Sequence, residues 1–265
     1  MGNCASIMGV FPSKLKRTDA DIGLAVNLWV SDKWAAVRKY GSITDWDTSA
    51  VTNMKELFRD KQEFNDFIGN WNVSNVIDMS YMFHGASSFN QDISGWNVSN
   101  VTDMSYTFRG ASSFNQPLGQ WNVANVNTMR YMFSSAYSFN QPLGQWNVAH
   151  VTDMGFMFQF AKAFNQPLDQ WNVGNVTTMD DMFNGASSML EGYKRGVGGD
   201  GSNGIDPKLI RTDGDLRAAV TLWRSDREAA ELKYGHISQW DTSEVTDMST
   251  LFSDMEDFND DISQW

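Results

Sequence analysis

The chain is poor in cysteine and in long apolar runs, and each shortage excludes a class of protein. Its 265 residues include one cysteine, Cys4, so no disulfide can form within the chain and no thiolate metal site can be built. No apolar run reaches the roughly 18 residues that suggest a membrane-spanning helix. The formal net charge of −12 argues against sequence-independent nucleic-acid binding, which needs clustered lysine and arginine.

Charge is also scarce in the middle of the chain. Between Trp71 and Ser188 there is no glutamate, and the only basic residues are Arg109, Arg130 and Lys162. The remaining polar residues there are mainly asparagine, glutamine, serine and threonine. Because a solvated surface ordinarily carries more charge, this neutral polar surface suits recognition of a protein or a glycan through many hydrogen bonds.

A 25-residue repeat dominates the sequence. Tryptophan recurs at this interval, and the apolar residues between two tryptophans keep the same phase from one unit to the next. Such strict self-similarity indicates stacked units whose apolar residues point inward. Proline inside the pattern excludes a single long helix. The tryptophans are Trp46, Trp71, Trp96, Trp121, Trp146 and Trp171, and the prolines are Pro117, Pro142 and Pro167.

The repeat predicts an α+β repeat fold, a solenoid of about six 25-residue coils. We expect a short strand within Trp96–Val101 and a helical turn over Asp103–Gly110, with the recurring aspartate seven residues after tryptophan capping its start. Three prolines in register would leave gaps in a central strand, so Pro117 is expected at a corner, with Phe114 and Leu118 turned inward around it.

Three in-phase rows are the candidate structural positions. The phenylalanine row is expected in the core, and the tryptophan row beside it with one ring edge at the surface, because tryptophan is rarely fully buried. The asparagine row is expected to hydrogen-bond the proline corner from coil to coil. The rows are Phe83, Phe108, Phe133 and Phe158; Trp71, Trp96, Trp121 and Trp146; and Asn90, Asn115, Asn140 and Asn165.

A second internal copy precedes the repeats. Residues 17–51 and 211–245 match at a constant offset of 194, and Ile22, Ala25, Val26 and Trp29 have helical spacing. Helices of this kind serve as the polar caps that an open stack needs. We therefore divide the chain into a tail at 1–11, a helical cap at 12–45, the repeat array at 46–190, a glycine-rich linker at 191–206, a second cap at 207–239, and the first repeat of an incomplete second array at 240–265.

The repeats resemble the BspA-like leucine-rich-repeat surface proteins in their mycoplasma-type 25-residue form. The resemblance is carried by WNVSNVTDMSYTFRGASSFNQ (Trp96–Gln116) and its copies. The segment LWRSDREAAELKYGHISQWDTSEVTDM is similar to the leader found on such arrays in microalgae. The resemblance implies a right-handed leucine-rich-repeat-like solenoid, a cell-surface or interaction role, and no catalytic residues.

The first six residues, MGNCAS, fit an acylation pattern. Gly2 would accept a myristoyl group and Cys4 a palmitoyl group, and two acyl chains together anchor a protein stably to a membrane. Lys14, Lys16 and Arg17 are assigned to the cap rather than to a supporting basic patch, because Pro207–Asp213 has most of the same residues far from the acylation motif.

The histidines and the linker offer little chemistry. His84, His150 and His236 fall at different phases of the repeat without metal-ligand spacing, and we expect ordinary surface residues. His150 stands where the other coils have asparagine. The linker segment Asp200–Asp206 weakly resembles a calcium loop but lacks the ligand spacing and the distal glutamate. No cofactor and no metal are expected.

These observations favour a non-catalytic interaction or adhesion module that binds a protein or a glycan at a cell surface. The alternative is a lipid-anchored intracellular scaffold on the cytoplasmic face of a membrane, acylated at Gly2 and Cys4. A distant alternative is an ice-binding or other structural surface protein, although Ile77 and Asn127 interrupt the threonine row that ice binding would need.

Overall fold

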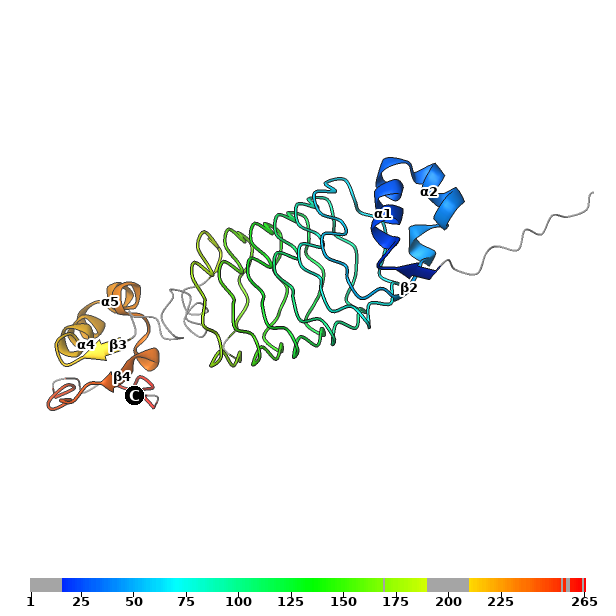
Figure 1. Cartoon of the computed structure of the whole chain (residues 1–265). Helices are drawn as coiled ribbons and strands as arrows, with labels where there is room; N and C mark the ends of the chain where they lie inside the picture. The colour runs from blue at the N-terminus through cyan, green and yellow to red at the C-terminus, as the bar shows by residue number, and fades with distance from the viewer. Residues whose placement is uncertain (1–15, 169, 190–209, 254, 256–257, 264) are drawn as a thin grey trace, which may run out of the picture.

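The computed structural model describes residues 16–168, 170–189, 210–253, 255, 258–263 and 265 (Figure 1). The described chain forms a helical cap, a stack of coils, and a second helical unit. The expected tail at 1–11, the expected linker at 191–206, its calcium-like segment, and the acylation candidates Gly2 and Cys4 lie outside these residues.

The first cap consists of two short helices beside a parallel pair of strands. β1 (Lys16–Thr18) pairs with β2 (Asp47–Ala50), and between them come α1 (Ile22–Ser31), α2 (Lys33–Tyr40) and the 3-10 helix η1 (Ile43–Asp45). α1 buries the four residues whose spacing indicated a helix: Ile22, Ala25, Val26 and Trp29.

Turn chemistry sets the ends of α2. The Asp32 side chain accepts a hydrogen bond from the Ala35 amide at 2.9 Å, and Gly41, with φ of 75°, ends the helix in a left-handed conformation. Arg17 is 3% exposed and forms an ion pair with Asp21 at 2.9 Å, so this cation belongs to the interior of the cap.

Two aspartates attach the cap to the first coil. Asp19 accepts hydrogen bonds from the Thr52 amide at 2.8 Å and from the Asn53 amide at 3.1 Å. Asp66 accepts from Trp29 Nε1 at 2.8 Å and pairs with Lys33 Nζ at 2.6 Å. In later coils, the groups equivalent to Thr52, Asn53 and Asp66 face the preceding coil. The cap therefore takes the place that a preceding coil would have.

The path of each coil is a series of turns, and the predicted strand and helical turn are both wrong. Trp96–Val101 contains a turn rather than a strand, and Asp103–Gly110 is not helical. Bridges between coils occur one residue per coil, as Asp78↔Asp103 and Asp103↔Thr128, both parallel. The Asp103 carboxylate accepts from the Ser105 amide at 2.8 Å, so it closes a turn instead of capping a helix.

Alternating backbone amides explain why no helix forms there. The amides of Met79 and Tyr81 donate to the carbonyls of Asp103 and Ser105 in the next coil, at 3.0 and 2.9 Å. The amide of Met82 instead donates to Met79 within its own coil, at 3.1 Å. Every second residue is thus committed to the neighbouring coil, which a helix would not allow.

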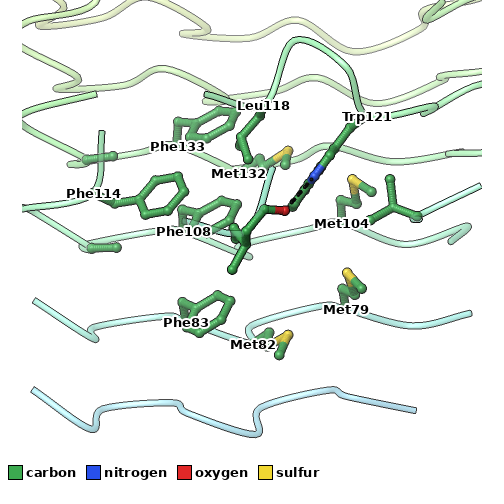
Figure 2. Close-up of a cluster of buried hydrophobic side chains, with 14 of the residues drawn as sticks. Met79, Met82, Phe83, Met104, Phe108, Phe114, Leu118, Trp121, Met132 and Phe133 are labelled. Atoms are coloured by element: carbon green, nitrogen blue, oxygen red, sulfur yellow. Dashed lines mark hydrogen bonds between the residues drawn. The ribbon is translucent and has the colours of Figure 1, made fainter. Parts of the chain in front are cut away.

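The interior of the stack is made of in-register rows (Figure 2). Phe83, Phe108 and Phe133 are 0% exposed, and both successive ring-centroid distances are 5.5 Å. The Trp121 Nε1 group donates to the Ile93 carbonyl at 3.2 Å inside the stack. Trp121 is only 3% exposed, so the expectation of a ring edge at the surface is wrong.

Each proline corner is joined to its neighbour by asparagine. The Asn115 amide donates to Asn90 Oδ1 at 2.9 Å, and the Gln116 side chain donates to the same oxygen at 2.9 Å. The Asn140 and Asn165 amides donate in the same way to the preceding asparagine, each at 2.9 Å. Pro117 itself is exposed, while Phe114 and Leu118 on either side are fully buried.

The second helical unit repeats the plan of the first cap with its own core. The Asp213 and Asp260 carboxylates accept from the Thr246 amide and from Trp223 Nε1, as Asp19 and Asp66 do in the first cap. Its elements are β3 (Ile210–Thr212), α4 (Leu216–Ser225), α5 (Arg227–Tyr234), η3 (Ile237–Gln239) and β4 (Asp241–Glu244).

Candidate functional site

A second aromatic row lies at the surface of the stack. Ten residues after the tryptophan of their coils stand Tyr81, Tyr106, Tyr131 and Phe156, all partly exposed. Their rings are stacked, with successive centroid distances of 4.3, 4.8 and 4.5 Å. The buried phenylalanine row of the same coils has wider spacing, so this outer row is a separate, continuous column of rings.

The backbone beneath this row is unusual. Tyr81, Tyr106, Tyr131 and Phe156 have φ between 56° and 60°, in the left-handed region. Bulky residues rarely adopt this conformation, and each does so at a cost of roughly 1–2 kcal/mol. Glycine would fit there without that cost. The same position is also left-handed at Glu56 and Asp181, with φ of 59° and 51°, so this conformation belongs to the turn of each coil and is not specific to the aromatic residues.

Guanidinium groups flank the rings. The Arg59 Cζ atom lies 5.3 Å from the Tyr81 ring centroid, and that of Arg109 lies 5.6 Å from the Tyr131 centroid. Arg130 lies 5.2 Å from Tyr131 and 4.9 Å from Phe156. Arg109 and Arg130 are two of the three basic residues between Trp71 and Ser188, so cationic charge in the middle of the stack gathers beside this row.

His84 connects three coils within the same region. Arg109 Nη1 lies 2.9 Å from His84 Nε2, and His84 Nδ1 lies 3.4 Å from Asp60 Oδ1. Because the guanidinium can only donate, Nε2 must accept, and the ring proton resides on Nδ1, facing Asp60. Burial and then the Arg109 charge lower the pKa of His84 below its ordinary value of 6.5. The imidazole is therefore neutral at neutral pH.

The Tyr81 phenol also stays neutral. Burial raises the pKa of Tyr81, and the adjacent Tyr106 raises it further. Burial acts to lower the pKa of Arg130, but Asp153 and the Tyr106 hydroxyl outweigh that effect and the pKa is raised. This region therefore offers phenolic hydroxyls and permanently charged guanidinium groups. We call it the aromatic–arginine strip and define it as Tyr81, Tyr106, Tyr131, Phe156, Arg59, Arg109, Arg130 and His84.

The other surface rows carry out structural tasks. A mostly polar row lies six residues after each tryptophan. In it, Thr102 Oγ1 donates to the Ile77 carbonyl at 3.3 Å. Four residues after each tryptophan, Asn100 Nδ2 donates to the Ser74 carbonyl at 2.7 Å. His150 stands at that same position, and its Nδ1 lies 2.6 Å from the Ala124 carbonyl, so it replaces the asparagine.

The rows singled out from the sequence lie apart from the strip. The tryptophan and phenylalanine rows fill the interior, and the asparagine row joins the corners. His236 belongs to the second unit, where its ring lies 5.0 Å from that of Trp223. The strip itself was missed, although its signal was present as tyrosine or phenylalanine at one phase of four successive coils.

The described residues contain neither a candidate metal site nor a helix able to span a membrane. Among the residues that the structure describes, no group of three or more histidine, cysteine, aspartate or glutamate side chains could hold a metal ion. Within those same residues no helix is long and apolar enough to cross a membrane.

Comparison with known proteins identifies the repeat by family. No curated protein and no solved structure matches the chain. One family model, described as "Mycoplasma protein of unknown function, DUF285", matches residues 30–132, 95–195 and 224–265. These segments include the whole repeat array and the second unit from Arg224 onward, and they cover more than half of the chain. The chain therefore belongs to the DUF285 family of mycoplasma proteins.

Proposed function

We propose that this protein is a non-catalytic interaction module and that the aromatic–arginine strip binds a protein partner. The observation that carries the proposal is the column of stacked surface rings beside three arginines. Tyrosine and arginine are among the residues that dominate binding energy at protein interfaces. A surface that is otherwise poor in charge makes this concentration the natural candidate for a binding face.

The stacking of the rings on one another favours a protein partner over a glycan. Sugars bind aromatic side chains mainly through the flat ring face, and here the faces of Tyr106 and Tyr131 are covered by neighbouring rings 4.3 to 4.8 Å away. What remains at the surface is ring edges and phenolic hydroxyls, beside guanidinium groups that already have partners in the chain: Arg59 pairs with Glu56 at 2.9 Å and Arg130 with Asp153 at 3.5 Å. These groups suit carboxylate and backbone carbonyl acceptors of a polypeptide.

We also infer the type of fold and the cellular location from the repeat. The coil stack is proposed to be a right-handed solenoid of the leucine-rich-repeat type, as in the BspA-like surface proteins, with the strip as one face of it. Display at a cell surface follows from that resemblance. The lipid-anchored scaffold is the second candidate, and intact-mass measurement of the N-terminal peptide from the native source separates the two.

The test compares two surface rows of the same coils. The strip variant carries Tyr106→Ser, Arg109→Ser and Tyr131→Ser, and the control variant carries Thr102→Ala, Asn127→Ala and Thr152→Ala. Immobilised full chain captures partners from an extract of the native source, and the recovered protein is then purified for titration. Loss of interface hot spots should weaken binding at least about thirtyfold in the strip variant, with the control unchanged.

Two results would contradict the proposal. Partner binding that is equal in the wild type and the strip variant would remove the strip as the binding face. Binding to arrayed glycans that survives the strip variant and is lost in the control would assign recognition to the polar rows and to sugars.

A further inference from the structure

The first cap exposes apolar side chains that the second unit lacks at the same positions. Trp34 is 81% exposed, Leu24 66%, Val30 43% and Val37 42%. At the constant offset of 194 residues, the second unit has Glu228, Ala218, Arg224 and Glu231 in their places. Both helix pairs have the same lengths, and their helices bury corresponding residues, so the exposed apolar residues are not needed to form the pair.

Charge distinguishes the two helix pairs as well. α2 contains three basic residues, Lys33, Arg38 and Lys39, and no acidic one. The equivalent α5 contains two basic and two acidic residues. In a chain with a formal net charge of −12, the outer helix of the first cap is thus a locally basic element.

The position of α2 leaves it accessible. α1 buries four residues against the coils, whereas α2 buries only Ala36, and Figure 1 shows α2 on the side of α1 that faces away from the stack. Trp34, Val37 and Arg38 have the spacing that places side chains on one face of a helix. Apolar and cationic groups are therefore presented together at the end of the molecule.

We propose that this cap face docks onto an anionic lipid surface, through Trp34, Val37 and Leu24 with Arg38 and Lys39 beside them. Tryptophan favours the membrane–water interface, and a helix that combines it with basic residues binds anionic headgroups electrostatically while its apolar side chains enter the boundary region. The inference is independent of the strip, and it places the stack end-on at a membrane with the strip free along its side.

Charge argues against a second copy as the occupant. A symmetric dimer through this face would bring Arg38 and Lys39 of α2 against the same two cations of the partner helix. Like charges across an interface are unfavourable.

The acylation motif at Gly2 and Cys4 precedes the cap in the sequence, and a single acyl chain needs a second membrane signal for stable anchoring. The cap face would provide that signal.

The experiment uses the full chain made without acylation, mixed with vesicles of phosphatidylcholine alone or of phosphatidylcholine with phosphatidylserine. The exchange variant carries Leu24→Ala, Val30→Arg, Trp34→Glu and Val37→Glu, which are the residues of the second unit. The single variant Trp34→Glu changes only one highly exposed side chain. The control variant Ile77→Thr, Tyr137→Ser removes apolar side chains that are 51% and 46% exposed on the coils.

The wild type and the control should sediment with the phosphatidylserine vesicles, and both cap variants should bind at least about tenfold more weakly. High salt should release the wild type, since the headgroup attraction is screened. Thermal melts of each variant show that the cap remains folded.

Three outcomes would overturn the proposal. The first is absence of wild-type binding to either vesicle. The second is equal binding by the wild type and Trp34→Glu, or equal wild-type binding to neutral and anionic vesicles. The third is concentration-dependent dimerisation that the exchange variant abolishes, since it would identify a second copy as the occupant.

Discussion

Two of the aromatic columns in the coils, one buried and one at the surface, differ in almost everything except register. In the inner column, Phe108 and Phe133 are fully buried, and their rings stack at 5.5 Å. In the outer column, Tyr106 and Tyr131 stack at 4.8 Å, lie partly exposed, and occupy left-handed backbone beside arginines. Stacking in register therefore does not by itself tell a core residue from a surface one.

The difference lies in what surrounds the rings. An inner ring removes apolar surface from water and fills space that no other group can fill, so its loss leaves a cavity. An outer ring gains contact with its neighbours but carries backbone strain, and its loss leaves only solvent. The inner column therefore holds the stack together, and the proposed function assigns the outer column to contacts with a partner.

The largest expected effect comes from cutting the inner column. Phe133→Ala should lower the free energy of unfolding by roughly 3–5 kcal/mol, because the ring is fully buried between Phe108 and Phe158. Denaturant melts of the full chain measure this. A loss below about 1 kcal/mol would mean that the inner column does not support the stack.

A smaller effect is expected at the corners between coils. Asn115→Ala removes the oxygen that accepts from the Asn140 amide at 2.9 Å and from Gln141 Nε2 at 3.0 Å. Leaving these part-buried donors without that acceptor should cost about 1–3 kcal/mol in the same melts. Asn122→Ala is the matched control, since Asn122 is exposed and accepts only within its own coil, from Ala124 at 3.2 Å. Equal losses in both variants would refute the inter-coil role of Asn115.

The inner column could be predicted from sequence, whereas the outer one was missed although its aromatic residues share one phase. Spacing alone places Phe133 inside, because every inward position repeats at the same phase and a stack needs a continuous core. For Trp121 the prediction of a ring edge at the surface was wrong. The prediction of the backbone path between the inward residues of one coil was wrong. Gaps of three and four residues around Met104 and Phe108 are typical of a helix, yet alternate amides there bond to the next coil.

That error concealed the backbone conformation of the strip. In a helical turn, Tyr106 would lie on the face opposite Met104 and Phe108, and nothing in its side chain indicates left-handed backbone, which glycine or asparagine normally signals. The left-handed backbone of Tyr106 becomes evident only once the hydrogen bonds between coils fix the chain path. The first cap behaved differently, since the helical spacing of Ile22, Ala25, Val26 and Trp29 was sufficient to predict α1.

The smallest effect is a pH dependence confined to the strip. Because the pKa of His84 is lowered in the folded chain, the unfolded chain takes up the proton first as pH falls through 6.5. Stability should therefore decline from neutral pH down to the lowered pKa, and His84→Gln should decline less over that range. Melting temperatures across a pH series measure the difference. Parallel curves for the two proteins, or a wild type that gains stability on acidification, would contradict the Arg109–His84 contact.

One comparison tests the central claim most directly: the free energy of unfolding of Tyr131→Gly set against that of Phe133→Ala. Glycine at position 131 relieves the left-handed strain, where φ is 56°, while it loses the stacked ring. The two effects should nearly cancel, so Tyr131→Gly should stay within about 1 kcal/mol of the wild type. A loss for Tyr131→Gly as large as that for Phe133→Ala would show that the outer column is a structural support, and the strip would lose its standing as a binding face.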